Sequence, residues 1–98
     1  MTREDVIGKI NDEFEKNSIT YEEVTEHTYS VTVGNKQVML TFYELSVGIT
    51  AYWNTRNNSH RLASMDFFYD DITMVWVSEK RLFVQSGRSY NVFYLGRD

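Results

Sequence analysis

The chain has 98 residues and a net charge of −4, and its composition is that of an ordinary globular protein. So short a chain has no room for a second core, which predicts a single domain over residues 1–98. It contains no cysteine, which excludes a disulfide framework and a thiolate zinc site. No stretch resembles a secretory signal or a membrane span, so we expect a cytoplasmic protein that does not insert into membranes.

The acidity belongs to the first half of the chain. Residues 1–45 carry four Lys/Arg against nine Asp/Glu, giving −5, whereas residues 46–98 carry six against five, giving +1. Binding to nucleic acids depends largely on cations that meet phosphates. An acidic balance therefore disfavours nucleic acid as the default partner and favours a basic protein.

Residues 3–16 are predicted to form a helix. Thr2 is followed at the right spacing by Asp5, as in an N-terminal cap, and Asn17-Ser18 is a plausible stop. Apolar residues recur at spacings of three and four, which places them on one face. They are Val6, Ile7, Ile10 and Phe14.

The period then changes to two, which is typical of strands. Residues 20–26 are ambiguous: they fit either a short helix capped by Thr20 or a strand that extends residues 28–33, and we favour the strand. Gly34-Asn35 fits a type II′ hairpin turn, and Gly48 is interpreted as a bulge within the following strands. Further strands are predicted over residues 36–45, 47–53, 62–69, 72–77, 81–86 and 90–95.

These elements predict an α+β fold, in which the helix packs on a six- or seven-stranded antiparallel meander sheet. Residues 65–80 are interpreted as a hairpin that turns at Asp70-Asp71. Several strands are apolar on both faces, and one helix cannot cover so much surface. Three arrangements would account for this: curling toward a barrel, a homodimer through the second face, or exposed aromatic residues that bind a partner.

The sequence contains few groups that suggest catalysis or metal binding. The layout of helix and sheet resembles that of microbial ribonucleases, and a hydrolase of that kind would use Glu44, His60, Arg56 and Arg61. The last three lie in one polar segment, which favours a solvated loop. Asp66, Asp70 and Asp71 supply too few ligands for a calcium loop and suit a turn. We therefore predict no catalytic residue, metal or cofactor.

A second alternative is binding of single-stranded nucleic acid by the C-terminal half, where aromatic residues alternate with arginines. The half-domain charge of only +1 weighs against it. The residues concerned are Tyr52, Trp53, Arg56, Arg61, Phe83, Arg88, Tyr90, Tyr94 and Arg97.

The favoured interpretation is a non-enzymatic protein-binding module. Its basis is the large number of aromatic residues, the usual anchors of interfaces, together with the acidic N-terminal half. In bulk character such a domain resembles bacterial immunity proteins and phage-encoded inhibitors of bacterial defence, which implies inhibition of a basic or nucleic-acid-handling protein. The candidate contact residues are Glu22, Glu23, Glu26, Tyr43, Tyr52, Trp53, Tyr69, Asp70 and Asp71.

Overall fold

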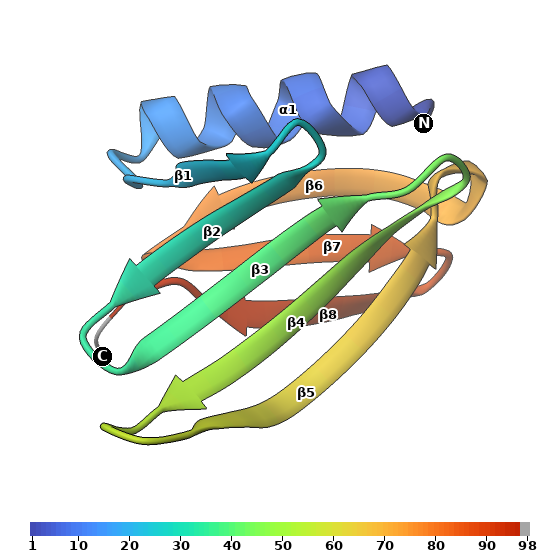
Figure 1. Cartoon of the computed structure of the whole chain (residues 1–98). Helices are drawn as coiled ribbons and strands as arrows, with labels where there is room; N and C mark the ends of the chain where they lie inside the picture. Colours follow the sequence, from blue (N-terminus) through green and yellow to red (C-terminus); the bar gives the residue numbers. More distant parts are fainter. Residues whose placement is uncertain (97–98) are drawn as a thin grey trace.

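The computed structural model describes residues 1–96, which form one helix and two antiparallel sheets (Figure 1). The helix is α1 (Arg3–Lys16). The first sheet has the order β1 (Glu22–Thr25), β2 (Thr28–Val33), β3 (Lys36–Phe42), β4 (Ser46–Asn54) and β5 (Ser59–Phe68). A short 3₁₀ turn, η1 (Tyr69–Asp71), leads into the second sheet, which consists of β6 (Ile72–Ser78), β7 (Arg81–Ser86) and β8 (Ser89–Tyr94).

The predicted limits of α1 are confirmed, because strong local signals set both ends. The Thr2 hydroxyl accepts a hydrogen bond from the Asp5 backbone N–H, and the Asp5 carboxylate accepts one from the Thr2 N–H. These bonds satisfy two backbone donors that the first turn of a helix leaves free. The hydrogen bond that the Asp5 carboxylate accepts from the Thr2 N–H lowers the pKa of Asp5. At the other end the C-cap is Asn17, and Ser18 adopts a left-handed φ of 57°.

The prediction of one continuous meander, with residues 65–80 as a hairpin, is wrong. The chain leaves the first sheet at η1, so β5 and β6 belong to different sheets. Neither sheet closes into a barrel; instead the three-stranded sheet lies behind the five-stranded one (Figure 1). Phe67 of β5 and Phe93 of β8 meet edge to face between the sheets, with ring centroids 6.2 Å apart. The inward faces of both sheets therefore share one hydrophobic core.

Helix α1 closes one side of this two-sheet arrangement and leaves the opposite side open. It runs beside β1 and β6 (Figure 1), and the buried Glu13 carboxylate accepts a 2.9 Å hydrogen bond from the Val77 N–H of β6. On the other side, an apolar pocket of about 290 Å³ lies between β3–β5 of the first sheet and β8 of the second, and β5 and β8 are the edge strands there. No helix in residues 1–96 is long and apolar enough to span a membrane.

Three finer predictions have mixed outcomes. Residues 22–25 are a strand, but β1 is separate from β2 and pairs with it in antiparallel fashion, because the chain turns at Glu26–His27. The two-residue turn at Gly34-Asn35 is confirmed, with the positive φ of 59° at Gly34 that a type II′ turn requires. Gly48 is not in a bulge: it pairs in register with both neighbouring strands, and the irregularity of β4–β5 lies at Leu62.

Candidate functional site

An open pocket of about 1070 Å³ lies at the end of the molecule where α1 begins, and we call it the end pocket. Four segments that are distant in the sequence line it: the start of α1, the β1–β2 turn, the β3–β4 loop and η1. The β3–β4 loop and η1 lie at the end of the sheets that carries the N-terminus (Figure 1). Its lining residues are Thr2, Arg3, Glu4, Thr25, His27, Thr28, Thr41, Phe42, Tyr43, Glu44, Leu45, Phe68, Tyr69, Asp70 and Asp71.

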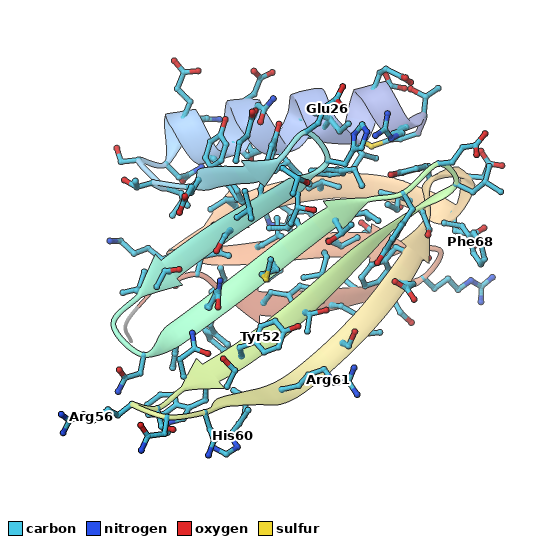
Figure 2. The ribbon with its side chains drawn as sticks, viewed as in Figure 1. Glu26, Tyr52, Arg56, His60, Arg61 and Phe68 are labelled. Atoms are coloured by element: carbon cyan, nitrogen blue, oxygen red, sulfur yellow. The ribbon has the colours of Figure 1, made fainter. Side chains whose placement is uncertain are left out.

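Three large apolar side chains of the end pocket face solvent. Leu45 is 71% exposed, Phe68 is 61% exposed and Tyr43 is 55% exposed. Figure 2 shows Phe68 pointing away from the sheets at this end. Single exposed apolar residues are common on protein surfaces, whereas a cluster beside a concave surface is typical of an interaction site.

Gly48 makes room for the Tyr43 ring. A Cβ atom at Gly48 would lie 3.0 Å from Cε2 of Tyr43, a contact tight enough to push the ring away, and 2.8 Å from Oδ1 of Asp66, which real Cβ atoms essentially never approach so closely. The ring therefore rests across the backbone of β4. Sequence reasoning assigned Gly48 to a bulge, but its role is to permit this close approach.

Tyr69, which was predicted as a contact residue, lines the end pocket but is almost entirely buried. The side chain is only 4% exposed, because η1 turns it inward toward the core. Its hydroxyl donates a 2.6 Å hydrogen bond to the Tyr43 carbonyl, so it holds the β3–β4 loop in place. Burial raises the pKa of the Tyr69 hydroxyl above the usual 10.0, an effect that the Arg3 charge partly offsets.

The end pocket is strongly acidic. Four exposed carboxylates line it, and a single arginine, Arg3, is the cation among the lining residues. The Arg3 guanidinium donates to the carbonyls of Tyr43 and Phe42 at 3.1 and 3.2 Å and lies 2.8 Å from Nδ1 of His27. It therefore links α1 to the β3–β4 loop. The carboxylates are those of Glu4, Glu44, Asp70 and Asp71.

The remaining predicted contact residues do not share one surface. Glu22 and Glu23 are exposed on β1. Glu26 is exposed in the β1–β2 turn, between the pocket residues Thr25 and His27. Tyr52 and Trp53 lie near the far end of β4, and Figure 2 shows Tyr52 well separated from Glu26. The structure thus brings together Tyr43, Asp70 and Asp71 in the end pocket, whereas Glu26 is not among its lining residues.

The residues considered for catalysis or metal binding are not assembled into one site. Glu44 precedes β4 and His60 follows its far end, so the length of a nine-residue strand separates them. Arg56 lies at the tip of the β4–β5 hairpin, whereas His60 and Arg61 belong to β5, and the three side chains point in different directions (Figure 2). Within residues 1–96, no three His, Asp or Glu side chains are grouped closely enough to hold a metal ion, and this includes Asp66, Asp70 and Asp71.

The outer face of β6–β8 carries an aromatic surface, of which sequence reasoning named Phe83, Tyr90 and Tyr94 but omitted Trp76. Trp76 and Phe83 stack with ring planes 3° apart and centroids at 4.8 Å, and Tyr90 lies beside both. The Arg81 guanidinium lies 5.4 Å from the Tyr94 ring centroid. The two-residue alternation of residues 74–77 is the signal that indicates this surface, since Val75 and Val77 face the core. Arg97 lies outside the described residues.

We compared the chain with protein-family models, with curated proteins and with solved structures. No family model matches the sequence, and no curated protein matches it. No solved structure matches the fold.

Proposed function

We propose that this protein is a non-enzymatic binding module that holds a basic, partly apolar segment of another protein in its end pocket. The observation that carries the proposal is the combination found there: exposed Tyr43, Leu45 and Phe68 beside four carboxylates. Aromatic and aliphatic anchors supply most of the affinity of an interface. Charges at the rim select the partner and accelerate association.

Charge complementarity supports a basic partner. The pocket contains four carboxylates against one arginine, and that arginine is already hydrogen-bonded to two backbone carbonyls. An acidic segment would meet repulsion there. If the partner's basic segment normally contacts phosphates, occupation of the pocket would block that contact, which is how such a module would act as an inhibitor.

The test is affinity capture from the native cell with matched charge variants. Asp70→Lys combined with Asp71→Lys changes the pocket by four charge units, and Asp12→Lys combined with Glu15→Lys makes the same change on exposed positions of α1. We expect the first variant to lose the captured protein and the second to retain it. Equal retention by both variants would refute the proposal.

Binding of single-stranded nucleic acid remains a second candidate, because Phe83, Tyr90, Tyr94 and Arg81 do gather on one face of β6–β8. The bases of a single strand would need aromatic side chains whose ring faces are exposed, so that they could stack on them. Trp76 and Phe83 instead cover each other, and Arg81 lies over Tyr94. These contacts favour the protein-binding function.

The second candidate is tested by titrating single-stranded oligothymidine while following tryptophan fluorescence. Quenching that disappears in Tyr90→Ala and weakens steeply with salt would support it. Absence of quenching at low salt would exclude this surface as a strand-binding platform.

A further inference from the structure

The longest free edge of the molecule is β5, and its exposure requires an explanation. It has ten residues, of which only Phe67 is buried. A long edge strand presents unpaired backbone N–H and C=O groups that readily pair with another chain. The other edges are better protected: β1 has four residues, β8 has six, and α1 lies against β6, where Glu13 accepts the Val77 N–H.

We propose that β5 pairs in antiparallel fashion with β5 of a second copy of this chain, so that two five-stranded sheets form one ten-stranded sheet. In such a symmetric pair the two-fold axis passes between one residue and its own copy, and side chains opposite each other point to the same face. The axis must therefore be placed so that inward residues meet inward residues along the whole strand.

The irregularity in β5 decides which of its residues share a face and can lie opposite one another. Ala63 pairs with Ala51 of β4 but Arg61 pairs with Tyr52, so Leu62 is an extra residue and the alternation shifts there. As a result Arg61 shares the outer face with Ser64, Asp66 and Phe68. Without Leu62, nine residues of the ten remain in the pairing, and Ser64 is the middle one. An axis at Ser64 pairs the strand over its full length.

The same register is complementary in charge and in polarity. It sets Arg61 directly opposite Asp66 of the copy on the outer face. Because the dimer is two-fold symmetric, Asp66 also faces Arg61 of the copy, so the interface contains two such pairs. Neither residue makes an ion pair within residues 1–96. On the inner face it sets Ala63 opposite the exposed Met65 of the copy, beside the apolar pocket between β5 and β8. Axes at Ala63 or Met65 would leave both charges unmatched.

A cysteine at the axis tests the register directly, because the chain contains none. Residues directly opposite across strands have Cα atoms about 4.5–5.5 Å apart, which suits a disulfide. We expect Ser64→Cys to form a covalent dimer under mild oxidation about tenfold faster than Thr32→Cys, an exposed control on β2. Equal rates for the two variants would overturn the proposal.

Charge reversal tests the contact that sets the register. In sedimentation equilibrium, Arg61→Asp or Asp66→Arg alone should weaken dimerisation about tenfold, because each creates two repulsive pairs in the symmetric dimer. The double variant should recover the dissociation constant of the unaltered chain, and circular dichroism checks that each variant folds. A chain that stays monomeric at millimolar concentration, or a double variant no better than the single ones, would overturn the proposal.

Discussion

At the scale of single residues, Tyr69 and Arg3 hold the β3–β4 loop of the end pocket in place. The Tyr69 hydroxyl donates a hydrogen bond to the Tyr43 carbonyl, and Arg3, at the start of α1, donates to the carbonyls of Tyr43 and Phe42. The exposed Tyr43 ring then lies against Gly48, where a Cβ atom would crowd it. The pocket is therefore held in shape by the fold, and a partner would find Tyr43 and Leu45 already in place.

Tyr69→Phe tests this positioning role. Loss of the hydrogen bond to the Tyr43 carbonyl should lower the free energy of unfolding by about 1 kcal/mol at neutral pH. Because burial raises the pKa of Tyr69, its contribution is complete below pH 10.0 and is lost as the pH rises through the raised value.

The measurement is urea unfolding of both proteins at several pH values. The stability difference between the unaltered chain and Tyr69→Phe should narrow above pH 10.0, because only the unaltered chain loses this hydroxyl's contribution. A difference that stays constant through the alkaline range would contradict the role given to Tyr69.

At the scale of elements, sequence patterns predict what is local and miss what depends on packing between distant segments. The limits of α1 and the turn at Gly34 follow from caps and glycine, which act within a few residues. The division into two sheets is not local. Asp70-Asp71 is equally suitable for a hairpin turn and for η1, and only the core shared by Phe67 and Phe93 favours the second.

Candidate site residues show the same limit. The two-residue period indicates which side chains leave the core, as for Phe68 in β5. It cannot indicate that the β3–β4 loop and η1 lie side by side. Sequence reasoning therefore named Tyr43, Asp70 and Asp71 but omitted Leu45 and Phe68, which complete the apolar part of the end pocket.

The contact between α1 and β6 makes a specific prediction about Glu13. Glu13→Ala leaves the buried Val77 N–H without an acceptor, which should lower the free energy of unfolding by about 2 kcal/mol. Glu13→Gln keeps an oxygen at the same place and should cost clearly less. Urea unfolding measures both, and amide hydrogen exchange of Val77 reports the bond itself. Equal losses for the two variants would show that the acceptor oxygen does not matter.

The β6–β7 turn holds two residues in a conformation that their side chains disfavour. Glu79 and Lys80 have φ of 52° and 59°, the left-handed values of a type I′ turn, in which Asn-Gly is preferred. Glu79→Asn combined with Lys80→Gly should raise the free energy of unfolding by about 1 kcal/mol. A lower urea midpoint for this variant would contradict the reading of the turn as strained.

At the scale of the whole molecule, three exposed surfaces differ in chemical character. The end pocket is acidic and apolar, the outer face of β6–β8 is aromatic, and β5 offers a free edge. The end pocket and β5 meet at Phe68, which lines the pocket and would lie opposite Ser59 of the copy in the dimer. Asp70 and Asp71 lie outside β5, and Arg61 and Asp66 are not among the lining residues of the pocket, so different variants address the two contacts. The protein-binding function and the dimer can therefore be tested separately.

The end pocket is the central claim, and NMR tests it most directly. Backbone amide shifts of the full chain would be followed while a synthetic peptide of alternating lysine and leucine is added. We predict saturable shifts concentrated at residues 43–45 and 68–71, and none of comparable size with a peptide of glutamate and leucine. Shifts concentrated on β6–β8, or shifts equal for the two peptides, would contradict the account.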